Sequence, residues 1–202
     1  MKKKYRKLLC EGIPLLLWCA CTLISEELPA SFSLFLAILL HEAGHLLALL
    51  LLGMNWPKLA VGPLGFRLLP ERPLFFWEQG LVAFAGPLVN LLSALLLTWL
   101  FGFTTPAQLH LLTALANLLP IDTLDGGRIV EALLSMCCSP EHTYVIVRAL
   151  SFLTVTLATM ISLGLLWTRG QGSYLFFLFF SLFLLHIFRH TGSQPRNSSP
   201  FL

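Results

Sequence analysis

Two histidines and a glutamate fall within the pentad HEAGH, and their types and spacing suit a metal site. His41 and His45 are four residues apart, so on a helix both imidazoles project from one face, one turn apart. Glu42 lies beside them and is the type of residue that accepts a proton from a metal-activated water. This zincin-type pattern predicts zinc ligation by His41 and His45, with Glu42 as the base.

The pentad lies inside an apolar stretch, residues 35–52, which is long enough to cross a bilayer. A charged side chain near the bilayer centre costs about 2.5–3.5 kcal/mol on insertion scales, so ionisable residues need a reason to be there. Metal ligation is one reason, and a simple hydrogen bond to a neighbouring helix is the alternative. A third ligand elsewhere in the chain would decide between them.

The composition is that of an all-α polytopic membrane protein. Of the 202 residues 56% are hydrophobic and 11% charged, and the mean hydropathy is +0.80, which excludes an ordinary soluble domain. The net charge of +3 is too small to indicate a nucleic-acid partner. The five cysteines lie in or beside apolar segments, where we expect them to be buried filler and not a disulfide framework.

We predict six transmembrane helices in a single domain, residues 1–190, followed by a short polar cytoplasmic tail, residues 191–202. The predicted spans are residues 8–24, 31–54, 74–103, 107–138, 144–167 and 173–188. Of the 13 Lys and Arg residues, all but Arg169 fall on the side that this arrangement assigns to the cytoplasm. Both termini are therefore expected to be cytoplasmic, with short turns at residues 104–106 and 139–142.

A stretch rich in proline and glycine, residues 55–73, follows the HEAGH helix and cannot be helical. Its short apolar runs could pair as a membrane-associated hairpin or could form a plain connecting loop, and the residues do not distinguish the two. A hairpin would offer an exposed edge strand for an extended peptide.

The fourth apolar segment is interrupted by NLLPIDTLDGGR, residues 117–128. Pro120 and the Gly126–Gly127 pair would break a continuous helix. Irregular backbone at membrane depth is tolerated only where it lines a cavity or packs on protein, so the break indicates a site. Asp125, directly before the glycines, is the predicted third ligand, and Asp122 competes with it on composition.

The third span contains AGPLVN, residues 85–90, in which Gly86 and Pro87 permit a kink. Asn90 is either a helix–helix contact or part of the site. The remaining histidines lie at or near span ends and are predicted to be structural: His110, His142, His186 and His190.

Three motifs, HEAGH at 41–45, AGPLVN at 85–90 and NLLPIDTLDGG at 117–127, together resemble the site-2 protease family of intramembrane zinc metalloproteases. The resemblance covers residues 8–190. The six-span plan, with no room for an inserted PDZ domain, is most similar to the branch that includes the stage IV sporulation protein FB peptidases. That branch suggests a sporulation setting in a bacterial cell membrane.

The resemblance implies that His41, His45 and Asp125 hold one zinc ion and that Glu42 is the catalytic glutamate. It selects Asp125 over Asp122, because the family ligand directly precedes the glycine pair. The implied reaction is peptide-bond hydrolysis in a membrane-associated protein substrate, within or near the bilayer. Membrane-protein regulators are further expected partners.

Three other residues receive implied roles near the substrate. Asn117 and Pro120 are expected to shape the Asp-bearing loop and contact substrate, and the amides of Asn90 and Asn117 could donate to the substrate backbone or the oxyanion. Two departures from the family matter. The cystathionine-beta-synthase domain of some members is absent, which argues against nucleotide sensing, and Asp122–Thr123 occupies a usually more apolar stretch.

Two alternative functions compete with proteolysis. A divalent-metal transporter could also place His and Asp at an interrupted membrane helix, and a catalytically silent membrane chaperone needs no chemistry at all. Glu42 discriminates, because a transporter needs no base beside the first ligand and a chaperone needs none of the set.

Overall fold

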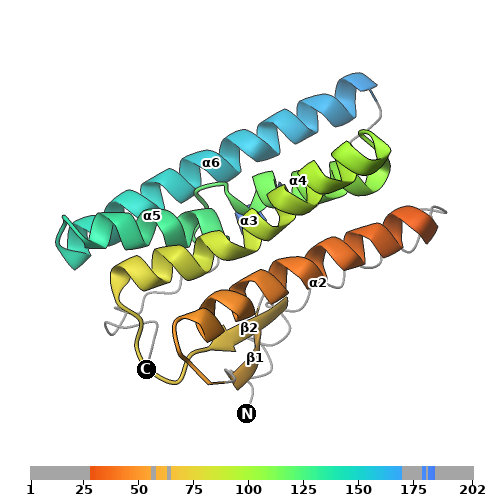
Figure 1. Cartoon of the computed structure of the whole chain (residues 1–202). Helices are drawn as coiled ribbons and strands as arrows, with labels where there is room; N and C mark the ends of the chain where they lie inside the picture. Colours follow the sequence, from red (N-terminus) through yellow and green to blue (C-terminus); the bar gives the residue numbers. More distant parts are fainter. Residues whose placement is uncertain (1–27, 56–57, 63–64, 170–178, 181, 185–202) are drawn as a thin grey trace, which may run out of the picture. The chain divides into compact units, whose positions relative to one another are not determined.

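The computed structural model describes residues 28–55, 58–62, 65–169, 179–180 and 182–184. The described residues fall into two compact units, one with residues 28–55, 58 and 68–151 and the other with residues 59–62, 65–67, 152–169, 179–180 and 182–184. Figure 1 labels the elements in chain order, which are α2 (Leu28–Leu51), β1 (Lys58–Gly62), β2 (Gly65–Leu69), α3 (Phe76–Phe101), α4 (Thr105–Asn117), α5 (Asp125–Ser135) and α6 (Pro140–Arg169).

Three of the described helices are long and apolar enough to cross a membrane, as expected of an integral membrane protein. They are Ala30–Leu51 in α2, Phe76–Phe101 in α3 and Pro140–Trp167 in α6, and they correspond to the second, third and fifth predicted spans. The first predicted span lies outside the described residues, as does most of the sixth. The total of six therefore stays a prediction.

Two predicted turns are shorter than expected, because helices begin inside them. Helix α4 begins at Thr105 with Pro106 in its first turn, and α6 begins at Pro140. Proline suits the first helical turn, since its missing N–H has no intrahelical acceptor there and its fixed φ is helical. Residues 105–106 and 140–142, predicted as turn, are therefore helical.

The stretch after α2 contains the hairpin that the sequence left open. Strands β1 and β2 are separated by two residues and pair in a two-stranded sheet. So short a connection allows only antiparallel pairing of consecutive strands.

Helix α3 is central to the unit that holds the predicted site, because it packs against α2, α4 and α5 (Figure 1). Alanines dominate the buried positions: Ala37, Ala48, Ala83, Ala94, Ala107, Ala114 and Ala132. Small residues let membrane helices approach closely. At Gly44 helix α2 lies directly against the backbone of α3, since a Cβ there would lie 2.7 Å from the Ala85 carbonyl oxygen.

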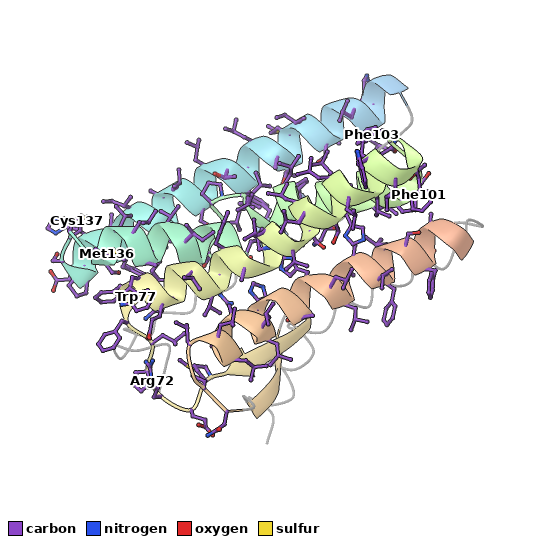
Figure 2. All side chains as sticks on the ribbon, viewed as in Figure 1. Arg72, Trp77, Phe101, Phe103, Met136 and Cys137 are labelled. Carbon is purple, nitrogen blue, oxygen red and sulfur yellow. The ribbon has the colours of Figure 1, made fainter. Side chains whose placement is uncertain are left out.

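Large apolar side chains point outward along the helices, as expected for a lipid-facing surface. Figure 2 shows Trp77 and Phe101 at opposite ends of α3, and both are more than half exposed. A helix rises about 1.5 Å per residue, so these rings lie about 36 Å apart along the axis. That length exceeds the hydrocarbon core of about 30 Å, so α3 is long enough to hold aromatic rings at both interfaces of a bilayer.

An ion pair fixes the start of α3. Glu78 is only 3% exposed, and its carboxylate accepts hydrogen bonds of 2.8 and 2.6 Å from the two terminal nitrogens of Arg72. It also accepts from the Phe75 backbone N–H at 2.9 Å, as a capping glutamate does. These bonds tie the loop after the hairpin to the first turn of the helix.

The other unit contains most of the hairpin and the remainder of α6. Val155 and Leu182 are buried within it. The rings of Phe152 and Phe183 lie 6.2 Å apart, centroid to centroid. This ring contact joins α6 to the helical residues 182–184.

Candidate metal centre

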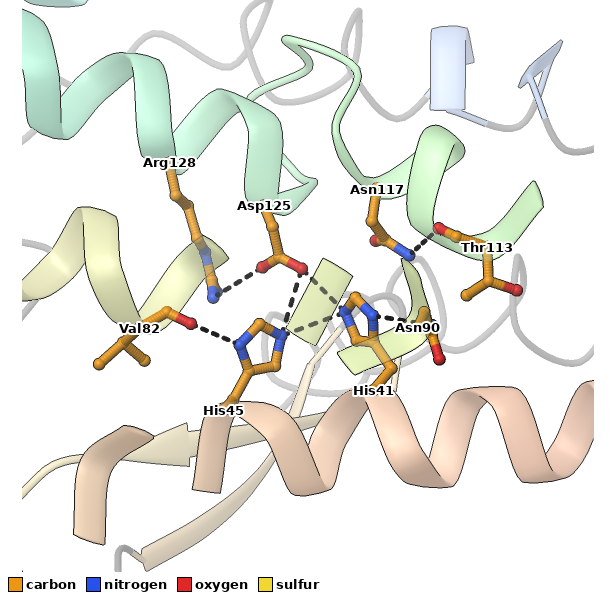
Figure 3. Close-up of polar contacts among 8 residues, drawn as sticks. All are labelled: His41, His45, Val82, Asn90, Thr113, Asn117, Asp125 and Arg128. Atoms are coloured by element: carbon orange, nitrogen blue, oxygen red, sulfur yellow. Dashed lines mark hydrogen bonds and ion pairs between the residues drawn. The ribbon is translucent and has the colours of Figure 1, made fainter. Parts of the chain in front are cut away.

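Three buried side chains from two separate helices converge on one point. His41 and His45 project from α2, and Asp125 projects from the first residue of α5 (Figure 3). The Nε2 atoms of His41 and His45 lie 2.8 and 3.2 Å from Oδ2 of Asp125. The two Nε2 atoms are 3.1 Å apart. The predicted proximity of the HEAGH pair and Asp125 is therefore present.

This triangle of atoms fits a single metal ion. All three residues are less than 10% exposed, and each offers one ligand atom within 4.8 Å of the others. Zinc bonds of about 2.0–2.1 Å in a tetrahedron would separate the ligand atoms by roughly 3.3 Å, close to the observed separations. Two imidazoles and one carboxylate are also a typical donor set of catalytic zinc sites, which leave a fourth position open.

A backbone carbonyl orients the second histidine. Nδ1 of His45 lies 2.8 Å from the Val82 carbonyl oxygen in α3. A carbonyl oxygen only accepts, so Nδ1 carries the proton and Nε2 of the neutral ring keeps its lone pair for a metal. This contact was not foreseen, because no side-chain pattern in the sequence identifies a carbonyl acceptor.

The position of Gly86 gives the AGPLVN motif a steric role. A Cβ at Gly86 would lie 2.5 Å from Nε2 of His45 and 2.8 Å from Nε2 of His41. Those are the ligand nitrogens themselves. Glycine therefore keeps α3 clear of the space in which a metal ion would sit, and Pro87 follows it inside a helix that continues to Phe101.

The predicted break in the fourth segment is confirmed, and it positions Asp125. Helix α4 ends at Asn117 and α5 begins at Asp125. The negative charge of the Asp125 carboxylate is therefore stabilised by the positive end of the α5 dipole. A Cβ at Gly126 would collide with the backbone of Leu118, and one at Gly127 with the backbone of Ile121. The glycine pair thus lets α5 begin directly against the loop.

Asp125 also has a cationic neighbour one turn along α5. Nη1 of Arg128 lies 3.7 Å from Oδ1 of Asp125, the oxygen that does not face the imidazoles (Figure 3). The guanidinium therefore favours the orientation in which Oδ2 points to the histidines.

Asp122, the competing carboxylate, lies elsewhere. Its backbone N–H donates to the Ser151 hydroxyl at 3.0 Å, and that hydroxyl lies 3.3 Å from Oδ1 of Asp122. Asp122 therefore contacts α6, whereas Asp125 joins the histidines.

Glu42, the predicted base, is half-buried on α2 beside His41. It is close enough to His41, His45 and Asp125 to interact with them electrostatically. Its position suits a group that exchanges a proton at the edge of the metal centre.

The predicted substrate-contacting residues have contacts of their own. Asn90 is fully buried, with its amide between His41 and His110. The amide nitrogen of Asn117 donates to the Thr113 carbonyl within α4 at 3.0 Å. Pro120 lies in the loop between α4 and α5. A contact of these residues with substrate stays a prediction.

His110 was predicted to be a structural residue near a span end, and it lies closer to the site than expected. It is 2% exposed, and its Nδ1 is 3.0 Å from Oδ1 of Asn90. In the sequence, the spacing of His110 from Ala107, Ala114 and Asn117 indicates that these residues share one face of a helix. The sequence does not show that this face packs against α3, and so it does not place His110 near the site.

Fold and site together define a helical membrane protein with a buried two-histidine, one-carboxylate centre. Among solved structures the fold is similar to that of the Site-2 Protease from Methanocaldococcus jannaschii, with a TM-score of 0.59 and 19% identity over 93% of this chain and 90% of that chain. No protein-family model matches the chain, and no curated protein matches it in sequence. The shared fold agrees with the sequence resemblance, and no branch within the family is distinguished.

Proposed function

We propose that this protein is an intramembrane zinc metalloprotease of the site-2 protease type. The observation that carries the proposal is the convergence of His41, His45 and Asp125 within ligand distance, beside a half-buried glutamate at position 42. The structural likeness supports the same function. The transporter alternative has no support from it.

The depth of the centre supports chemistry inside the bilayer. Gly86, which faces the ligand nitrogens, is nine residues after Trp77 and 15 before Phe101 along α3. At about 1.5 Å per residue this places it roughly 14 Å from the Trp77 end and 22 Å from the Phe101 end. The centre would thus lie within the hydrocarbon layer, nearer the end of α3 that the charge pattern assigns to the cytoplasm.

In the proposed reaction Glu42 moves the proton. Zinc bound by His41, His45 and Asp125 would act as a Lewis acid that polarises a peptide carbonyl and lowers the pKa of a water to about 7. Glu42 accepts a proton from that water as the water oxygen attacks the peptide carbonyl carbon. Glu42 then gives the proton to the amine nitrogen as the C–N bond breaks, which leaves a carboxylic acid and an amine. Val82 and Arg128 hold the ligand side chains in place throughout.

The substrate in this proposal is a membrane-associated protein. A peptide bond inside a helix is hydrogen-bonded and shielded, so the substrate must unwind or present an extended segment, and we expect helix-weakening residues near its cleavage position. The β1–β2 hairpin, which contributes to the other unit, is a candidate for holding such a segment by strand addition. We also propose that the protein lies in a bacterial cell membrane with both termini in the cytoplasm, and that it acts in sporulation.

The test replaces Glu42 with its isosteric amide. Glu42→Gln keeps the volume and the metal ligands but cannot accept a proton, so we expect normal zinc content and a loss of cleavage of about 10²–10⁴-fold. Membrane proteomes of cells that carry wild type or variant should show precursors that accumulate only with the variant.

The matched control is Glu141→Gln, an exposed glutamate in the first turn of α6. It should leave both zinc content and cleavage unchanged. Cleavage that survives Glu42→Gln would exclude Glu42 as the base. A wild-type protein that binds no zinc would contradict the proposal as a whole.

A further inference from the structure

His110 is the polar member of a buried face on α4. Ala107 and Ala114 lie three residues before it and four after it, and both are fully buried. His110 is only 2% exposed, so its ring is removed from solvent and needs a hydrogen-bond partner within the protein. Asn90 on α3 is that partner, with Oδ1 3.0 Å from Nδ1 of His110.

Asn90 links His110 to the metal centre. The other end of its amide, Nδ2, lies 3.3 Å from Nδ1 of His41. A carboxamide donates from one end and accepts at the other, so its orientation ties the proton position on one imidazole to that on the other. In the observed arrangement Asn90 donates to His41 and accepts from the Nδ1–H of His110.

Metal binding requires the opposite arrangement. A metal on Nε2 of His41 needs the lone pair there, so the ring proton must be on Nδ1, where it needs an acceptor. When the Asn90 amide flips by about 180°, its Oδ1 becomes that acceptor and its NH₂ group points at His110. His110 can then accept through Nδ1 and carry its own proton on Nε2.

We propose that His110 is a positioning residue of the metal centre. Because a neutral imidazole has two tautomers, His110 can satisfy the Asn90 amide in either orientation, and it thereby stabilises the His41 tautomer that binds metal. An apolar side chain at this position could not accept from the turned amide. The inference rests on the metal site of the proposed function and assigns that site a residue that touches neither metal nor substrate.

A double-mutant cycle tests the proposal through zinc affinity, measured on the purified full-length chain by competition with a chromophoric chelator. His110→Leu should weaken zinc binding by about tenfold, the size typical of an outer-shell partner. In an Asn90→Asp background the carboxylate accepts from Nδ1–H of His41 without help from His110. The same His110→Leu change should then cause little further loss. His142→Gln, which replaces an exposed histidine on α6, is the matched control and should leave affinity unchanged.

The outcomes separate this inference from the proposed function. Equal losses in the two backgrounds would mean that His110 acts through packing alone and would overturn the inference, as would no loss in the wild-type background. Absence of zinc binding by wild type would instead contradict the proposed function.

A second measurement reads the tautomer directly in the unsubstituted protein, and a variant serves only to assign the His110 signal. Selective ¹⁵N labelling of the six histidines reports the tautomer of each ring by NMR. On addition of zinc, the signal assigned to His110 by its absence from His110→Gln should change from the Nδ1–H to the Nε2–H pattern. An unchanged tautomer would overturn the proposal.

Discussion

Two polar clusters of the same unit, one at the start of α3 and one at the metal centre, differ in whether their hydrogen-bonding groups are mutually satisfied. At the start of α3, the Glu78 carboxylate accepts two hydrogen bonds from Arg72 and one from the Phe75 N–H. Donors and acceptors match, and this carboxylate also raises the pKa of Arg72, so the guanidinium stays charged. The ion pair is complete without any further group.

The metal centre lacks that match. Three atoms that can each present a lone pair, Nε2 of His41, Nε2 of His45 and Oδ2 of Asp125, lie 2.8–3.2 Å from one another. One shared proton can bridge two of them but leaves the third without a donor. A cation bound by all three satisfies the whole set. A buried ionisable cluster therefore indicates function when its hydrogen-bond acceptors exceed its donors.

The largest effect is expected from removing the negative charge of a metal ligand. Asp125→Asn keeps the size of the side chain but removes its charge, so zinc affinity should fall by more than about a hundredfold, since even outer-shell losses cost 10–100-fold. Metal analysis of the purified protein measures the change. Asp122→Asn is the control, because Asp122 contacts Ser151 and should leave zinc content unchanged. The reverse pattern would show that the wrong carboxylate has been assigned.

A smaller but still large effect should follow from filling the space beside the ligands. Gly86→Ala places a methyl group 2.5–2.8 Å from the ligand nitrogens of His41 and His45, which must move apart. We expect zinc affinity to fall by at least about tenfold, comparable with outer-shell changes, although alanine is the better helix former.

The control for that substitution is Gly80→Ala on the same helix, where the nearest atom to the new Cβ is that of Ala132 at 3.5 Å. An ordinary contact of this kind should leave zinc affinity as it is. If Gly80→Ala and Gly86→Ala weaken zinc binding equally, the effect comes from the packing of α3 in general. That result would contradict a specific role for Gly86 in leaving space for the metal.

Much of the metal centre could be predicted from the sequence because its signals are local. The four-residue spacing of His41 and His45 predicts a shared helix face, and Pro120 with the glycine pair predicts the break before Asp125. The choice between Asp122 and Asp125 needed the family resemblance, since the two differ by three residues in an irregular loop. In the structure, the start of α5 brings Asp125 to the two histidines, whereas Asp122 contacts Ser151.

The remaining parts depend on packing between helices, which composition does not specify. The carbonyl of Val82 orients His45, and it is a backbone group that every residue possesses. His110 has the sequence context of a span-end histidine, and only the packing of α4 against α3 brings it to Asn90. The turns were predicted too long because a proline can begin a helix as well as end one, as Pro106 and Pro140 do.

The smallest effect is expected at the Arg72–Glu78 ion pair, where a substitution should change the stability of the fold and not the zinc affinity. Arg72→Met removes the cation and leaves the Glu78 carboxylate buried with only the Phe75 N–H as donor, which is costlier than replacing both partners. We expect thermal unfolding of the detergent-solubilised protein to shift down by several degrees, with zinc affinity unchanged. The double variant Arg72→Met, Glu78→Gln should recover part of that shift, because no unpaired charge stays buried. Loss of zinc binding in the single variant would contradict the contrast between the two clusters, since it would mean that the ion pair helps to shape the metal centre.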